Sequence, residues 1–109
     1  MTDDLQGSWT ITELLPDRTH PQTAEITFDE GRLHFYAGCN RAMGSYTFDG
    51  ATLVAGPVAM TLMYCPDMSA EEHLVRALAE PLDITIDDGS LTATGPAGGF
   101  TARRAPTPA

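Results

Sequence analysis

Cys39 and Cys65 are the only two cysteines of this 109-residue chain, and they open two chemical alternatives. An even pair can form a disulfide in an oxidising compartment, or stay reduced as small buried apolar groups in the cytoplasm. A bridge over this separation would stabilise the fold by about 3–4 kcal/mol in the chain-entropy model. The residue types alone leave both alternatives open.

Metal binding and nucleophilic catalysis are the next chemistries to consider. Zinc ligands usually come in close pairs, and neither the cysteines nor His34 and His73 form one. Both histidines are therefore predicted to be solvated. Cys39 as a nucleophile needs a base held within hydrogen-bond reach, for which His34 is one candidate. A cysteine-dependent enzyme is the least favoured of three functions, and no metal or cofactor is predicted.

Adjacent carboxylates occur at Glu71-Glu72 and Asp87-Asp88, but each pair has a local role in a helix cap or a turn. Glycosidase chemistry needs a carboxyl group kept neutral by burial, and no carboxyl lies inside an apolar run. The glycines of Gly95–Gly99 do not match a phosphate loop, because no Lys follows them and no helix begins there. No catalytic residue is predicted.

Three methionines gather around one apolar run, at Met60, Met63 and Met68. Flexible, polarisable Met side chains fill irregular gaps in a core and also line adaptable binding surfaces. Core filling is favoured, and these residues are kept as a candidate ligand or partner surface.

Four turn signals predict that these residues are carried by an antiparallel sheet. The turns are Asp29-Glu30-Gly31, Asp49-Gly50, Asp88-Gly89 and Pro96-Ala97-Gly98-Gly99. They join alternating segments at 25–28 and 32–36, at 44–48 and 51–54, and at 82–86 and 90–94, with a last strand over 100–103. Two-residue Asp-Gly loops favour type I′ turns, whose twist matches antiparallel strands.

Two further strands are predicted. Ser8–Leu14 alternates, with Trp9 and Ile11 on the inner face. Val58–Tyr64 is almost entirely apolar and is predicted to be a strand buried on both faces. The proline-containing segment Pro16–Thr23 is predicted to be a loop.

One amphipathic helix follows. Ser69–Glu72 has the pattern of a capping box, in which the Ser69 hydroxyl and the Glu72 carboxylate each bind the other's backbone N–H. Ala70, Leu74 and Leu78 then form one apolar stripe that must pack on the sheet, and Pro81 ends the helix.

The charge is strongly one-sided: 15 acidic residues face six basic ones, a net charge of −9. Phosphate and anionic membrane surfaces need Lys and Arg, so no nucleic-acid partner is predicted. No apolar run is long enough to span a membrane, and a monomer is expected. The N-terminus has no secretory pattern. The protein is predicted to be periplasmic or envelope-bound if an export signal has been removed, and otherwise cytoplasmic.

Two segments together resemble the META domain of HslJ-like heat-shock proteins, which are often envelope lipoproteins. They are Gly38–Tyr46 and Met60–Cys65. The motif residues are Gly38, Cys39, Asn40, Gly44, Tyr46, Thr61, Met63 and Cys65.

The resemblance implies an α+β fold, with a curved, barrel-like antiparallel sheet of about eight or nine short strands wrapped around one helix. It implies one domain over residues 1–104, and residues 105–109 are predicted to be a disordered tail. It favours a Cys39–Cys65 disulfide and supplies no enzymatic activity.

Gly and Asn tolerate positive φ, so Gly38-Cys39-Asn40 is interpreted as a bend or bulge between strands. The leading functional hypothesis is a non-catalytic envelope or stress-related module that binds an apolar ligand or a protein partner. The alternative is a purely structural or protein-interaction domain with no ligand.

Overall fold

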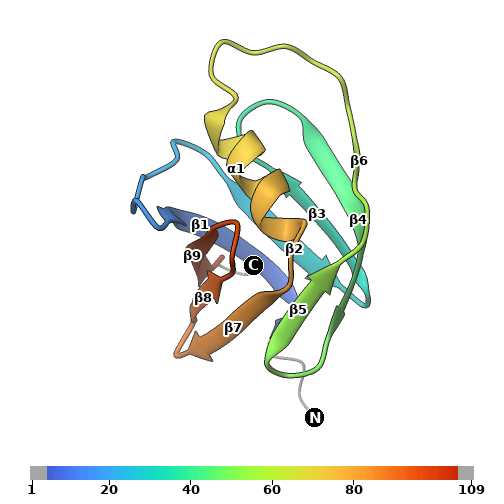
Figure 1. Ribbon diagram of the computed structural model, residues 1–109, viewed down its shortest axis with the longest axis vertical. Coiled ribbons are helices and arrows are strands. Elements are labelled where there is room, and N and C mark those ends of the chain that lie inside the picture. The colour runs from blue at the N-terminus through green and yellow to red at the C-terminus, as the bar shows by residue number, and fades with distance from the viewer. Residues whose placement is uncertain (1–4, 106–109) are drawn as a thin grey trace.

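The computed structural model describes residues 5–105, which form nine strands and one helix (Figure 1). The elements are β1 (Gly7–Leu15), β2 (Glu25–Asp29), β3 (Arg32–Tyr36), β4 (Arg41–Phe48), β5 (Thr52–Ala55), β6 (Ala59–Met60), α1 (Ser69–Leu78), β7 (Leu82–Asp87), β8 (Ser90–Thr94) and β9 (Gly99–Arg104).

Eight of these strands close into an antiparallel barrel. Neighbouring strands follow the order β1-β2-β3-β4-β5-β7-β8-β9, and β9 pairs back onto β1. The ninth strand, β6, lies outside the ring. It can do so because β4 is eight residues long: its C-terminal half pairs with β5, and its N-terminal half pairs with β6. The fold is mostly β, and the predicted barrel-like sheet with one helix is confirmed.

Short turns position the hairpins where the sequence predicts them. Both residues of Glu30-Gly31 and of Asp88-Gly89 have positive φ, as a type I′ turn requires. The turn at Asp49-Gly50 differs from the prediction. There β5 begins only at Thr52, and of the two turn residues only Gly50 has positive φ.

Large side chains fill the barrel interior. Trp9, Phe28 and Phe100 are almost fully buried, and Ile11 faces inward as predicted. The indole N–H of Trp9 donates to the Leu5 carbonyl at 2.9 Å, so its polar atom is satisfied inside the core. The barrel is thus closed by a packed core.

The predicted doubly buried strand over Val58–Tyr64 is wrong. Only Ala59–Met60 pairs as a strand, and Leu62 and Tyr64 are 97% and 89% exposed. The ring closes without this segment, so no central position in the sheet remains for it. Its chain instead leaves β4 and arches over one end of the molecule before entering α1 (Figure 1).

The helix spans Ser69–Leu78, within the segment predicted between Ser69 and Pro81, and lies across the open end of the barrel (Figure 1). Leu74 and Leu78 are buried in the core cluster, as the apolar stripe predicts. The predicted capping box is wrong. Met68 occupies the N-cap without a side-chain hydrogen bond, and the Ser69 hydroxyl donates to Asp67 Oδ1 at 2.7 Å.

At the C-terminal end, the Ala105 N–H donates to the Ser8 carbonyl at 2.9 Å. Ala105 therefore extends the pairing beside β1 and does not belong to a disordered tail. The rest of the predicted tail, residues 106–109, lies outside the described residues. Residues 5–105 contain no helix that is long and apolar enough to cross a membrane.

Candidate functional site

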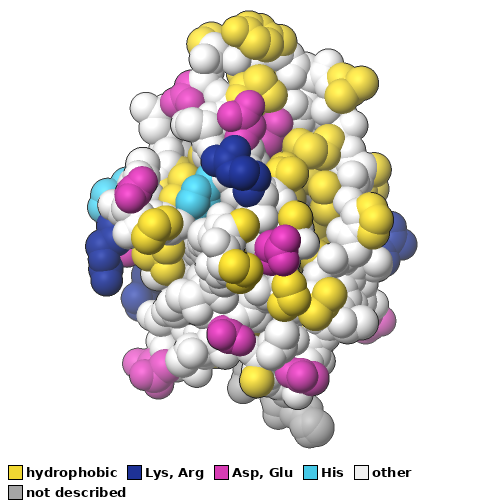
Figure 2. Space-filling view, in the orientation of Figure 1, with side chains coloured by type: hydrophobic (Ala, Val, Ile, Leu, Met, Phe, Trp, Pro, Cys, Tyr) yellow, Lys and Arg dark blue, Asp and Glu magenta, His cyan; other side chains and the backbone are white. Residues whose placement is uncertain are grey.

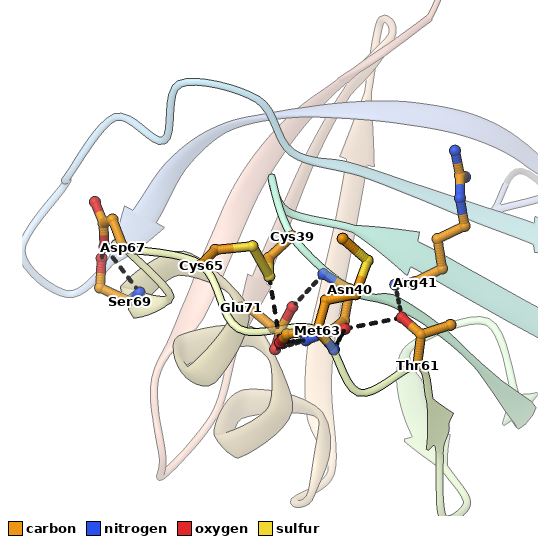
Figure 3. The surroundings of a disulfide bond; sticks show 9 residues. All are labelled: Cys39, Asn40, Arg41, Thr61, Met63, Cys65, Asp67, Ser69 and Glu71. Carbon is orange, nitrogen blue, oxygen red and sulfur yellow. Dashed lines mark hydrogen bonds between the residues drawn. A yellow bond between two sulfur atoms is a disulfide. The ribbon is translucent and has the colours of Figure 1, made fainter.

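The two motif segments meet at the end of the barrel, beside the start of α1 (Figure 3). Asn40, Thr61, Met63 and Glu71 form one hydrogen-bonded group, called the Asn40 cluster below. The disulfide between Cys39 and Cys65 lies next to it. These contacts join residues that are 21 to 31 positions apart in the chain.

Asn40 is the centre of the cluster and is only 3% exposed. Its Oδ1 accepts from the Met63 N–H at 2.6 Å and from the Thr61 hydroxyl at 2.9 Å. Its Nδ2 donates to the Met63 carbonyl and to Glu71 Oε2, both at 3.1 Å. An Asn amide has two donors and two acceptor sites, so its full capacity is used. Asn40 therefore fixes the backbone of Met63 through both its N–H and its C=O.

The bend predicted at Gly38-Cys39-Asn40 uses a positive φ at its glycine only. Gly38 has φ of 97°, as a glycine at a bend allows, whereas Asn40 is not among the positive-φ residues. Asn40 instead contributes through the hydrogen bonds of its side chain. Sequence reasoning missed this role because the partners lie on distant segments.

Glu71 is the second buried polar residue of the cluster, at 4% exposure. Its Oε1 accepts from the Asn40 backbone N–H at 2.8 Å, and Oε2 accepts from the Asn40 amide. The predicted local role in a cap is therefore wrong. A sequence signal existed: Glu71 lies three residues before Leu74 and seven before Leu78, on the apolar stripe of the helix.

The Cys39–Cys65 disulfide is the second tether of the same loop, with Cα atoms 6.0 Å apart. Cys39 is buried and Cys65 is half-buried. Cys39 Sγ lies 3.6 Å from the Met63 carbonyl oxygen, but a disulfide sulfur has no proton to donate. The loop from Thr61 to Cys65 is thus held by Asn40 in its middle and by the disulfide at its end.

This arrangement turns apolar side chains outward. Leu62, Met63 and Tyr64, called the apolar loop below, are 97%, 60% and 89% exposed. Figure 2 shows hydrophobic side chains at the end of the molecule where Figure 1 places the β6–α1 connection. Of the other two methionines in the predicted surface, Met60 and Met68 are half-buried, and Met60 packs against the core.

The remaining motif residues position β4. A Cβ on Gly44 would lie 2.8 Å from the Pro57 carbonyl oxygen, so only glycine lets the β5–β6 connection pass this close. Tyr46 packs edge-on against Phe28 with ring centroids 5.1 Å apart, and its hydroxyl donates to Gln6 at 3.3 Å. Both residues serve the fold around the cluster.

The histidines lie away from the cluster. His34 is exposed, as predicted, and lies on β3 opposite Met43 of β4. His73 is half-buried, with Nε2 2.9 Å from the Gly99 carbonyl oxygen, so the expectation of a solvated side chain is wrong there. Within residues 5–105, no three His, Cys, Asp or Glu side chains are grouped to hold a metal.

Cavities of about 450 and 520 Å³ open on the surface. The first is lined by polar groups, among them His20, Tyr36 and Asp67. Two hydrogen bonds from Ser69, first from its hydroxyl and then from its backbone N–H, lower the pKa of Asp67 below 3.8. Neither cavity is lined by the apolar loop, which projects from the molecule.

A closed eight-stranded antiparallel barrel, capped by one helix and carrying a tethered loop, defines the class of this protein. The META domain family model matches residues 3–106, and the chain belongs to that family.

Two solved structures share the fold. An NMR structure of a protein from Burkholderia xenovorans is 20% identical, with a TM-score of 0.75, over 93% of this chain and 83% of that one. A second NMR structure is also 20% identical, with a TM-score of 0.70, over 91% of this chain and 89% of the other. Among curated proteins, none matches this sequence significantly.

Proposed function

We propose that this META domain is a non-catalytic binding module that docks a protein partner through the apolar loop. The observation that carries the proposal is the exposure of Leu62 and Tyr64, at 97% and 89%, on a loop whose backbone is held from within. Large apolar side chains held in water are common at protein interaction sites.

The tethers make this surface suitable for binding. The hydrogen bonds from Asn40 to both polar groups of Met63 and the disulfide at Cys65 restrict the loop before any partner arrives. A loop that is already ordered loses less conformational entropy on binding. Leu62 and Tyr64 alternate with the tethered residues and therefore remain available for contact.

A protein partner is favoured over a small apolar ligand. Trp9, Phe28 and Phe100 fill the barrel interior, where related architectures hold small molecules. Small-molecule sites are usually concave, and the apolar loop is not part of either surface cavity described above.

The disulfide also supports an envelope location for the module. Disulfides persist in oxidising compartments and are rare in the cytosol. The protein would be isolated from cells with its thiols blocked at lysis, and its denatured mass measured. A mass two daltons below the reduced value supports this location, whereas two blocked thiols contradict it.

Site-specific photocrosslinking tests the partner itself. A photoreactive group at position 62 is expected to yield a discrete adduct in cells of the source organism, and the same group at Val54 is not. Val54 is the matched control because it is an exposed apolar residue on β5, outside the loop.

The adduct at position 62 should disappear in the Tyr64→Ser background. A loop that serves only the fold would give no adduct at position 62, or the same adducts as at position 54. That result would favour the purely structural alternative.

A further inference from the structure

We propose that the apolar loop, together with β6, forms an open sheet edge that takes up an extended, basic peptide segment as an added strand. This inference rests on the proposed function and names the kind of partner and its mode of binding.

The first argument is the direction of the backbone groups. Ala59 pairs with Met43 of β4, and the Thr61 N–H donates to the Arg41 carbonyl at 3.1 Å. In an antiparallel pair, alternate residues direct their N–H and C=O toward the neighbouring strand. The polar backbone groups of Met60 and Leu62 therefore point away from β4.

Asn40 continues this pairing beyond the end of β6. Its side-chain amide binds both the N–H and the C=O of Met63, as a neighbouring strand would (Figure 3). The segment from Ala59 to Met63 is thus held against β4 on one side only. Within residues 5–105, Leu62 and Tyr64 form no backbone hydrogen bond.

The second argument is that no charged residue or proline protects this edge over residues 59–65. The eight ring strands pair on both sides, and β6 is the described strand that ends the sheet. Besides keeping edge strands short, as β6 is with two residues, natural proteins block such edges with Lys, Pro or inward-pointing charges. Residues 59–65 contain none of these; Pro66 and Asp67 follow only afterwards. An unblocked edge is a template for strand addition.

The third argument concerns the identity of the added strand. The chain carries a net charge of −9, and Asp67 and Glu72 are exposed just beyond the loop. A second copy would bring two chains of −9 together and is disfavoured. Arg41, the nearby cation, is directed over the Tyr36 ring at 5.1 Å. An extended segment with alternating apolar and basic side chains can pair with the open edge and also complement the negative charge.

A synthetic nonapeptide of alternating Lys and Val tests this inference by NMR titration of the ¹⁵N-labelled, disulfide-bonded protein. Binding is expected to shift the amides of residues 60–64 and to slow hydrogen exchange at Leu62 and Tyr64. The same peptide with Glu in place of Lys should bind at least tenfold more weakly.

Two peptides with N-methyl groups separate strand addition from simple apolar contact. N-methylation along one edge of the peptide leaves the other edge able to pair, whereas methylation along both edges removes pairing and keeps every side chain. Loss of at least tenfold in affinity only for the doubly methylated peptide supports strand addition. Equal binding of both peptides overturns strand addition but leaves docking through the apolar loop intact.

Absence of any binding by the Lys-Val peptide also overturns the inference. So does sedimentation that shows a concentration-dependent dimer with the same amides shifted, because the occupant is then a second copy. The photocrosslinking experiment judges the proposed function separately, since it does not depend on hydrogen bonds along the edge.

Discussion

At the scale of single residues, Asn40 and Glu71 explain how the motif acts. Each is buried, and each polar atom of the two side chains has a hydrogen-bond partner. Groups that are buried and fully satisfied become costly when one partner is removed. The cluster therefore specifies one position for the loop.

Asn40→Ala is expected to lower the free energy of unfolding by about 3 kcal/mol, because it leaves Glu71 Oε2 and the N–H and C=O of Met63 without their partners. Thr61→Ala is the matched control, since Thr61 is exposed and water replaces its hydroxyl; its cost should stay below about 1 kcal/mol. Urea unfolding measures both. Equal costs for the two variants would contradict the central role of Asn40.

The variant Asn40→Asp tests the role of Asn40 through the pH dependence of stability. It would place two carboxylates side by side, which can share a proton in the folded state only. The folded variant then binds more protons than the unfolded one, so its stability deficit should shrink as pH falls from 7 to about 4.5. A pH-independent deficit in thermal unfolding would contradict this prediction.

Asp49 gives a second pH-dependent prediction. Hydrogen bonds from the backbone N–H groups of Thr52 and Ala51 lower its pKa below 3.8. A lowered folded-state pKa adds stability above the unfolded pKa, and this stability is lost as pH falls through the folded pKa. Asp49→Ala should therefore lower the Tm most above about pH 5, and the difference should shrink below pH 3.8. A Tm difference that grows on acidification would contradict this assignment.

At the scale of elements, the position of the loop after β6 is set by its tethers and not by its own apolar character. Its sequence alternates between positions that are tethered by hydrogen bonds, such as Thr61 and Met63, and positions that are not, such as Leu62 and Tyr64. The strand β4 provides the base because it pairs with three other strands.

Replacing both cysteines, in Cys39→Ser with Cys65→Ser, is expected to lower the free energy of unfolding by about 3 kcal/mol, because the open chain gains conformational entropy when unfolded. Amide exchange at Met63 should remain slower than at Leu62, since the Asn40 hydrogen bonds persist. Urea unfolding and hydrogen exchange measure these effects. Equal exchange at the two amides would show that the disulfide alone holds the loop.

At the scale of the whole molecule, stability comes from the closed barrel, and the apolar loop is separate from it. Trp9 is fully buried, bonds to Leu5, and lies under the Arg104 guanidinium, whose carbon is 4.2 Å from the ring centre. The loop side chains contribute little buried area.

Trp9→Ala is accordingly expected to cost about 3–5 kcal/mol, as large core truncations do. Leu62→Ser with Tyr64→Ser should change the free energy of unfolding by less than about 1 kcal/mol, because both side chains are exposed. Chemical denaturation compares the two variants. A loop variant as destabilised as the core variant would mean that the loop is part of the core and would remove the basis for docking.

The sequence by itself determined the hairpins, the position of the helix and its apolar stripe. Type I′ turns and alternation depend on neighbouring residues only. The local pattern is therefore enough to predict the strands Arg32–Tyr36 and Ser90–Thr94. Asp49-Gly50 shows the limit of this reasoning, because a side-chain hydrogen bond to Thr52 reshapes that turn.

Only the tertiary structure decided the partners of Asn40 and the exposure of the apolar loop. Asn40 and Glu71 are 31 residues apart and meet only once the barrel has closed beneath α1. The run Val58–Tyr64 has the composition of a core strand, but a closed ring of eight strands has no central place for a ninth. Composition measures how favourable burial would be, and strand pairing decides which segments are buried.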